Sequence, residues 1–252
     1  MKPRPSFPAR LDRVMEQPGN VPAPRRTAPA VPTQGHGMDS AAVRMAMVHK
    51  LAAQGISDAL VLQALGSVER HRFVDSALVN QAYEDTSLPI GLGQTISKPG
   101  VVARMLELLR NGKPGKLGRV LEIGTGCGYQ AALLSLVASE VYSIERLRGL
   151  HDKARDNLRA LRLHNLHLLF GDGMAGYAQG APYAGIIAAA GGQQLPQAWV
   201  DQLAVGGRLV APIHAHGGSQ KQALVVVDKT ATGVQHTVLE AVQFVPLKSG
   251  IA

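Results

Sequence analysis

The sequence predicts an α/β protein in which a doubly wound parallel sheet follows an N-terminal helical cap. From residue 119 onward, short apolar runs alternate with segments of helical periodicity, and the connections between them are short. Such alternation is typical of right-handed β-α-β units that build a parallel sheet. With 252 residues, the chain is long enough for one large domain with a full core.

The expected elements follow this pattern in chain order. Residues 1–37 hold eight of the fifteen prolines and six basic against two acidic residues, which predicts a disordered basic leader. Helical spacing predicts N-terminal helices within 40–66 and another helix over 101–109, with a loop rich in Gly and Pro between them. The later strands are expected at 119–123, 140–144, 166–170, 184–189 and 207–212, with a closing pair at 222–228 and 237–245, and the helices at 129–138, 149–161 and 196–203.

A glycine-rich turn joins the strand at 119–123 to the helix that follows. The chain reads R-V-L-E-I-G-T-G-C-G-Y-Q there, with glycine at Gly124, Gly126 and Gly128. Glycine at alternate positions leaves no Cβ on one side of the loop, so backbone N–H groups can approach a ligand at the helix N-terminus. This turn therefore predicts a cofactor that lies close to the main chain.

Two classes of cofactor use such a turn. A nicotinamide dinucleotide needs the spacing G-x-G-x-x-G/A, which Gly126, Gly128 and Ala131 satisfy. S-adenosylmethionine (SAM) carries an ammonium and a sulfonium and no phosphate, so it favours negative charge near the glycines. Glu122, two residues before the first glycine, is expected to supply that charge. The glycines alone leave both cofactors open.

Two further acidic positions at strand ends favour SAM. Glu145 closes the apolar run V-Y-S-I-E, where a carboxylate can accept hydrogen bonds from the ribose hydroxyls of either cofactor. Asp172 lies between Gly171 and Gly173 after the run L-H-L-L-F, where a carboxylate could contact an adenine amino group. The alternative for these acids is helix capping, which is common near helix N-termini.

Composition argues against several other functions. The net charge of +8 is partly concentrated in the leader, and aromatic residues make up only 4% of the chain, so a nucleic-acid surface is not expected. No apolar run approaches the ~20 residues of a membrane span. Because Cys127 is the only cysteine, no intrachain disulfide can form, and we expect a cytoplasmic protein. The pair His214 and His216 lacks nearby Cys or Asp, so no metal site is expected.

Several motifs together resemble the protein-L-isoaspartate O-methyltransferase family over about residues 40 to 250. They are L-P-I-G-L-G-Q-T-I-S (88–97), V-L-E-I-G-T-G-C-G-Y-Q (120–130), S-I-E-R (143–146), G-D-G (171–173), G-G-R-L-V-A-P-I (206–213) and F-V-P-L (244–247). The resemblance implies a Rossmann-like SAM-dependent methyltransferase domain over 38–252. It also implies methyl transfer from SAM to the α-carboxylate of L-isoaspartyl residues in damaged proteins or peptides, whose esters then collapse to a succinimide. Nothing in the sequence fixes the oligomeric state, and a monomer is favoured.

The resemblance also implies roles for the first motif. Ser97 matches the position assigned as the active-site residue, with Gln94, Thr95 and Ile96 around it as substrate-binding residues. A hydroxyl at residue 97 can donate a hydrogen bond to the substrate carboxylate and fix its orientation. That carboxylate has an ordinary pKa near ~3.9 and is ionised at pH 7, so no general base is needed. From the residues alone, Ser97 and Thr95 would be read as turn formers.

The chain departs from many relatives after the strand at 184–189. Ala184 occupies a position where they have Asp, and Gly191-Gly192-Gln193 replaces a loop that contains Pro. Because two glycines lose more entropy on ordering than a proline does, we expect a mobile loop with weaker substrate binding. This departure leaves a second hypothesis open, in which the protein binds SAM or isoaspartyl peptides without turnover.

Overall fold

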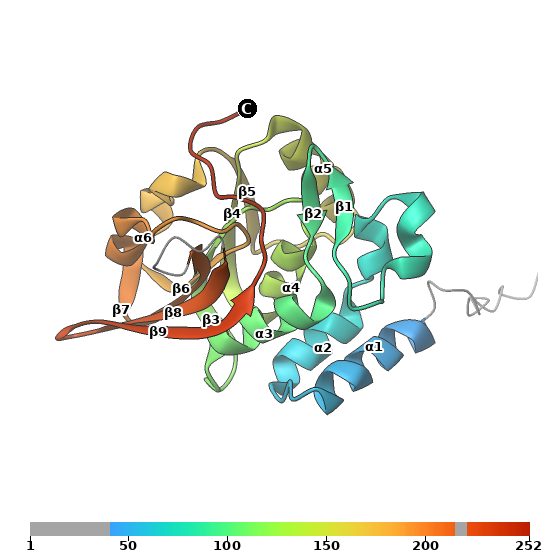
Figure 1. Cartoon of the computed structure of the whole chain (residues 1–252), viewed down its shortest axis with the longest axis horizontal. Helices are drawn as coiled ribbons and strands as arrows, with labels where there is room; N and C mark the ends of the chain where they lie inside the picture. Colours follow the sequence, from blue (N-terminus) through green and yellow to red (C-terminus); the bar gives the residue numbers. More distant parts are fainter. Residues whose placement is uncertain (1–40, 215–220) are drawn as a thin grey trace, which may run out of the picture. The chain divides into compact units, whose positions relative to one another are not determined.

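The structure is a computed structural model that describes residues 41–214 and 221–252. Seven strands form one sheet in the order β5-β4-β3-β6-β7-β8-β9, and β1 and β2 form a separate hairpin (Figure 1). The strands are β1 (Leu88–Gly91), β2 (Gln94–Ile96), β3 (Leu117–Ile123), β4 (Ala138–Glu145), β5 (Leu166–Phe170), β6 (Tyr183–Ala188), β7 (Leu203–His214), β8 (Gln222–Thr230) and β9 (Gly233–Val242). The α-helices are α1 (Ala41–Ala53), α2 (Ala59–Ser67), α3 (Pro99–Arg110), α4 (Tyr129–Val137), α5 (Arg148–Arg159) and α6 (Gln197–Gln202).

The order of the strands reverses at β3. Strands β3, β4 and β5 proceed in one direction across the sheet, β6 and β7 lie on the other side of β3, and all five are parallel. The last two strands, β8 and β9, pair antiparallel. The predicted doubly wound α/β fold is thus confirmed, and its ligand site is expected at the carboxyl ends of β3 and β6, where the order reverses.

Alternate residues of the sheet enter two different cores. Val120 belongs to the core formed with α1 to α5, whereas its neighbour Leu121 belongs to the core on the opposite face, around Trp199 of α6. This alternation is the side-chain period of a strand. Because both faces are covered, the central strands are apolar along nearly their whole length, as the sequence pattern requires.

Local signals set the ends of the cap helices and of α3. Asp58 caps α2 by accepting hydrogen bonds from the N–H groups of Leu60 and Val61. Its other carboxylate oxygen accepts from Arg110 Nε at 2.8 Å, and both side chains are almost fully buried. Helix α3 begins at Pro99, next to Ser97, so this buried ion pair fastens the cap to the helix that follows the predicted catalytic residue.

Two segments differ from the sequence expectation. Residues 88–96, expected to be a loop, form the β1–β2 hairpin, because Leu92 and Gly93 both have positive φ (52° and 69°) and make the two-residue turn that hairpins favour. The last strand begins at Gly233, four residues earlier than expected, because a tight turn leads directly from Thr230 into it. The other strands and helices shift by no more than four residues at either end.

Part of the expected organisation lies outside the described residues. This applies to the leader at 1–37, to the first residue of the helical segment at 40–66 and to His216. In the ranges that the structure covers, no helix is long and apolar enough to cross a membrane.

Candidate active site

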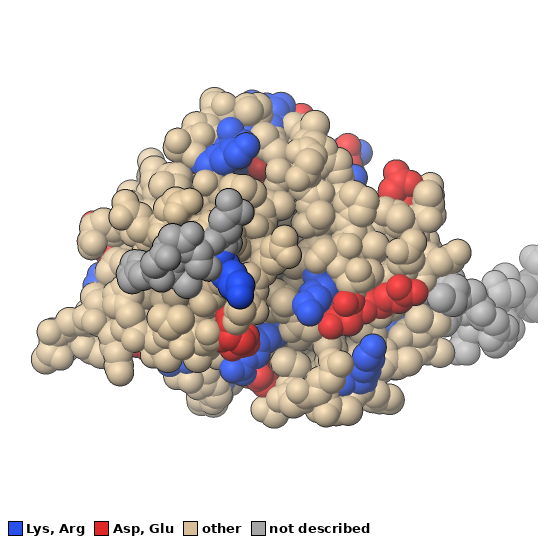
Figure 2. Space-filling model, in the orientation of Figure 1, with Lys and Arg blue, Asp and Glu red and all other residues tan. Residues whose placement is uncertain are grey.

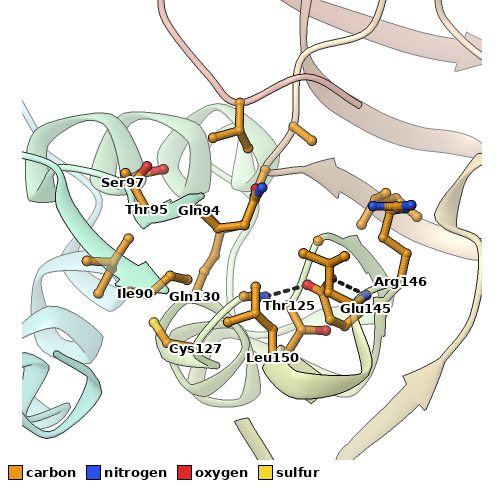
Figure 3. A pocket seen from close by; sticks show the side chains of 18 of the residues that line it. Ile90, Gln94, Thr95, Ser97, Thr125, Cys127, Gln130, Glu145, Arg146 and Leu150 are labelled. Atoms are coloured by element: carbon orange, nitrogen blue, oxygen red, sulfur yellow. Dashed lines mark hydrogen bonds between the residues drawn. The ribbon is translucent and has the colours of Figure 1, made fainter. Parts of the chain in front are cut away.

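A cavity of about 220 Å³ opens at the carboxyl ends of the parallel strands, where the strand order reverses. Three groups of residues from distant parts of the sequence face it: the β2 strand with Ser97, the glycine loop after β3, and the segment that follows β4 (Figure 3). The C-terminal residues Val245 to Lys248 form a further wall. The cavity therefore combines the cofactor loop with the proposed substrate residues.

The glycine loop adopts a backbone that other residues rarely reach. Gly124, Gly126 and Gly128 have φ values of 89°, 57° and 93°. A Cβ on Gly128 would also lie 2.7 Å from Leu158 Cδ1, so α5 packs directly on the loop. This close packing explains the glycine at residue 128, and all three glycines allow the left-handed turn that brings α4 to the cavity.

Glu145 joins the glycine loop to the segment after β4. One carboxylate oxygen accepts the N–H of Gly126 and the other accepts the N–H of Leu147, both at 2.9 Å. The residue is 5% exposed and lines the cavity. Each oxygen has a second lone pair, so the carboxylate can accept ribose hydroxyls while it holds the loop.

Glu122 lies beneath the cavity and is absent from its lining. The side chain is fully buried and accepts a hydrogen bond from Ser143 Oγ, which in turn contacts Thr125 Oγ1 at 2.6 Å. Burial raises the pKa of Glu122 to about 8. The carboxyl is therefore mostly neutral at pH 7, in contrast to the negative charge that the sequence led us to expect here.

Asp172 makes two contacts with the main chain. Its Oδ1 accepts the N–H of Met174 at 2.9 Å, and its Oδ2 accepts the N–H of Gly250 at 2.6 Å. The next residue, Gly173, does line the cavity. The carboxylate thus both caps a short helix and fastens the C-terminal segment beside the cavity.

The β2 strand brings the predicted substrate residues together. Gln94, Thr95, Ile96 and Ser97 all line the cavity, and Ile96 is buried among apolar side chains. Within the described ranges, the Ser97 hydroxyl makes no hydrogen bond to the protein, so it is available to a ligand. Ser97 and Thr95 also line a second, larger groove of about 1940 Å³, which places them where the two cavities meet.

Sequence reasoning missed several residues of the cavity wall. Thr125, Gln130 and Arg146 face the cavity, and the Nε2 of Gln130 is buried without a hydrogen-bond partner in the described part of the chain. Gln130 is the second residue of α4, directly after the glycine loop, and this position was a signal that could have identified it. Nothing local identifies Val245 to Lys248, because these residues reach the cavity through contacts with residues far away in the sequence.

The loop at 191–193 differs from the mobile loop expected. The N–H and C=O of Gly191 are bonded to Val245 and Leu247, both at 2.8 Å, and those of Gly192 to Pro212 and His214 at 3.1 and 3.0 Å. The main-chain groups of the two glycines are fully paired with β7 and the C-terminal segment, which argues against the mobility expected of them.

His214 lies at the end of β7 and lines the larger groove. Within 41–214 and 221–252, no three side chains of His, Cys, Asp or Glu come together in a way that could hold a metal ion.

The doubly wound sheet, with a cavity beside the glycine loop where the strand order reverses, defines a Rossmann-like α/β fold. A sequence model of the family described as protein-L-isoaspartate(D-aspartate) O-methyltransferase (PCMT) matches residues 42–252. The chain belongs to this family, whose activity is methyl transfer from SAM to isoaspartyl residues.

Relatives and solved structures agree with this assignment. A protein-L-isoaspartate O-methyltransferase of Methylibium petroleiphilum is 54% identical, with 99% of this chain and 97% of the relative covered. One of Leptothrix cholodnii is 61% identical over 90% of this chain and 80% of the relative. A Plasmodium falciparum structure titled as a putative member in complex with S-adenosyl-L-homocysteine is 25% identical, with a TM-score of 0.70 and coverage of 81% of this chain and 98% of that one.

Proposed function

We propose that this chain methylates the α-carboxylate of L-isoaspartyl residues with Ser97 as the residue that contacts the carboxylate and with the glycine loop and Glu145 as the SAM site. The observation that carries the proposal is the shared cavity, in which the free Ser97 hydroxyl and the Glu145 carboxylate face the same space. Bound SAM supplies a methyl group on a positively charged sulfur. The residues of the chain need only bind, orient and exclude water.

Each part of the site has a task in this reaction. The remaining lone pairs of Glu145 accept the ribose hydroxyls, while its bonds to Gly126 and Leu147 keep the loop in position. Ser97 donates a hydrogen bond to the substrate carboxylate and fixes its direction, with Gln94, Thr95 and Ile96 around it. Holding the oxygen in line with the transferred methyl group can supply on the order of 7–11 kcal/mol.

The apolar walls of the cavity favour a reaction in which two opposite charges are neutralised. A carboxylate and a sulfonium become two neutral groups, so the reacting charges are weakened in the transition state and little is gained from water. Ile90, Ile96 and Leu150 line the cavity and are nearly fully buried, which supports exclusion of water around the reacting atoms.

The acidic residues Asp172 and Glu122 are given roles that take account of their hydrogen bonds in the structure. Asp172 and Gly173 contact the adenine, although the Asp172 carboxylate also holds Gly250. Glu122 supports Thr125 from beneath through Ser143. We further propose that the protein acts in the cytoplasm, as a monomer, on isoaspartyl proteins and peptides and not on nucleic acid.

The test compares paired peptides that differ only in an aspartyl or isoaspartyl linkage, incubated with SAM labelled in its methyl group. We expect a base-labile product from the isoaspartyl peptide alone. Ser97→Ala should lower kcat/KM at least tenfold, because a hydrogen bond to a charged group is worth about 1.5–3 kcal/mol, with SAM affinity within twofold. Ser67→Ala, at the exposed end of α2, is the matched control and should behave as wild type. Binding of SAM and peptide without ester formation would refute the proposal.

A further inference from the structure

Strand β9 forms one edge of the seven-stranded sheet. It is ten residues long and pairs with β8 on one side, while no other strand in the described ranges pairs with its outer side. Figure 1 shows β9 at the front of the sheet, with β8 behind it. In an antiparallel pair, alternate residues direct their N–H and C=O groups away from the partner strand. The outer edge of β9 therefore presents a row of unpaired main-chain groups.

This edge lacks the basic residues and prolines that commonly protect an edge strand, and its pairing with β8 is regular from Gly233 to Val238, before an irregularity between Val238 and Ala241. Its sequence, G-V-Q-H-T-V-L-E-A-V, contains no Lys, Arg or Pro, and Val238 is 68% exposed. Its only charged residue, Glu240, accepts a hydrogen bond from Arg104 Nε of α3 at 3.0 Å. Long edges without basic residues or prolines readily pair with another chain, so this strand is suited to accept one.

The carboxyl end of β9 leads to the site. Glu240, Ala241 and Val242 line the larger groove, which continues to Ser97 and Thr95 and so reaches the cofactor cavity. Figure 2 shows acidic and basic side chains around the hollow beside this end of β9. The ion pair between Arg104 and Glu240 places the end of the strand beside α3, which begins two residues after Ser97.

We propose that the polypeptide on one side of the isoaspartyl residue adds to the outer edge of β9 as an extra strand and enters the groove at Val242, with the isoaspartyl carboxylate at Ser97. This inference rests on the proposed function. Main-chain pairing recognises any extended sequence, which suits an enzyme whose substrates share only a damaged linkage. The isoaspartyl linkage adds one carbon to the backbone and shifts the alternation of the strand, so regular pairing ends at that residue.

A second copy of the chain is the other occupant that such an edge could accept. Pairing of two β9 strands would not explain why the edge continues into the groove that contains Ser97. The substrate therefore accounts for more of the geometry, and the oligomeric state becomes an outcome of the test.

The kinetic test uses the full chain and isoaspartyl peptides with one residue on each side or with six residues on the N-terminal or C-terminal side. We expect one long flank to lower KM at least tenfold with kcat unchanged, because each main-chain hydrogen bond contributes about twofold to tenfold. N-methylation of alternate amides in that flank should return KM to the value of the short peptide. N-methylation of the amides between them should change KM by no more than about twofold.

Hydrogen exchange locates the contact. With S-adenosylhomocysteine present, the long peptide should protect alternate amides of residues 234–238, where β9 pairs regularly with β8, and the short peptide should not. A gain from neither flank, equal loss at every N-methylated position, or a dimer whose β9 amides are already protected without peptide would overturn the inference. If the short peptide is methylated but length has no effect, only this inference fails, whereas no methylation of either peptide refutes the proposed function as well.

Discussion

Gly191 and Gln222 provide a quantitative test of how the C-terminal wall of the cavity is held. Gln222 is 7% exposed, and its side-chain amide accepts the N–H of Phe244 at 2.7 Å and donates to its C=O at 3.2 Å. A Cβ on Gly191 would lie 2.3 Å from Gln222 Nε2. Gly191→Ala must therefore displace the amide and break both bonds, although its backbone lies outside the left-handed region and suits alanine.

The expected magnitude follows from these two bonds. At about 0.5–1.5 kcal/mol each, their loss should lower the free energy of unfolding by about 1–3 kcal/mol in Gly191→Ala, and by a similar amount in Gln222→Ala. In the double variant the clash no longer exists, and alanine in place of glycine stabilises by about 0.4–1 kcal/mol through the unfolded state. The double variant should thus be as stable as Gln222→Ala alone, or slightly more stable.

Urea denaturation of the wild type, both single variants and the double variant measures this coupling. Because Val245 and Pro246 line the cavity, SAM should also bind more weakly to both single variants in calorimetry. If the costs of the two single substitutions add within ~0.5 kcal/mol in the double variant, then Gln222 does not mediate the effect of Gly191, and the reasoning is refuted.

Three further predictions concern buried charges. Burial raises the pKa of Glu122 to about 8, so the folded state keeps a proton that the unfolded state releases above pH 4.5, and stability falls as pH rises between these values. Glu122→Gln should flatten this fall in urea denaturation from pH 5 to 8, and parallel profiles would contradict it. Arg110→Ala should lower the free energy of unfolding by about 3–5 kcal/mol because Asp58 stays buried without its partner, whereas the control Arg155→Ala, in an exposed pair, should change it by less than ~0.5 kcal/mol. Glu145→Ala should weaken SAM binding by about 1–3 kcal/mol in calorimetry, and unchanged affinity would remove its assigned role.

The parts of the site that sequence predicted depend on local patterns. The apolar runs before Gly124 and Glu145 mark the ends of two strands. Because parallel strands end at the same edge of a sheet, the sequence predicts that these two residues lie close together. The glycines of the loop also indicate a backbone with positive φ, since few other residues adopt these φ values. Fold and cofactor loop could thus be derived without tertiary information.

The parts that sequence missed depend on residues far apart in the chain. The main chain of Gly191 is paired with Val245 and Leu247, more than fifty residues later. The pattern Gly-Gly therefore indicated mobility, because the sequence does not show these distant hydrogen-bond partners. The β1–β2 turn was missed because Leu92, an apolar residue, occupies a left-handed position that usually favours Asn or Gly. The pairing of Gly191 has no local signal, whereas the glycines on either side of Leu92 were a local signal for the turn.

Glu122 and Glu145 show why residue type alone did not determine where an acidic side chain lies and what it contacts. Both follow the same pattern, an acid at the end of an apolar strand, yet Glu122 is buried beneath the loop beside Ser143, whereas Glu145 receives two backbone N–H groups and faces the cavity. Burial with few hydrogen-bond donors favours the neutral form of Glu122. Methyl transfer removes one positive charge from the cofactor and one negative charge from the substrate. Among the described residues that line the cavity, Glu145 is the only acidic side chain, beside the basic Arg146 and Lys248, so the wall carries few fixed charges when the reaction neutralises both reactants.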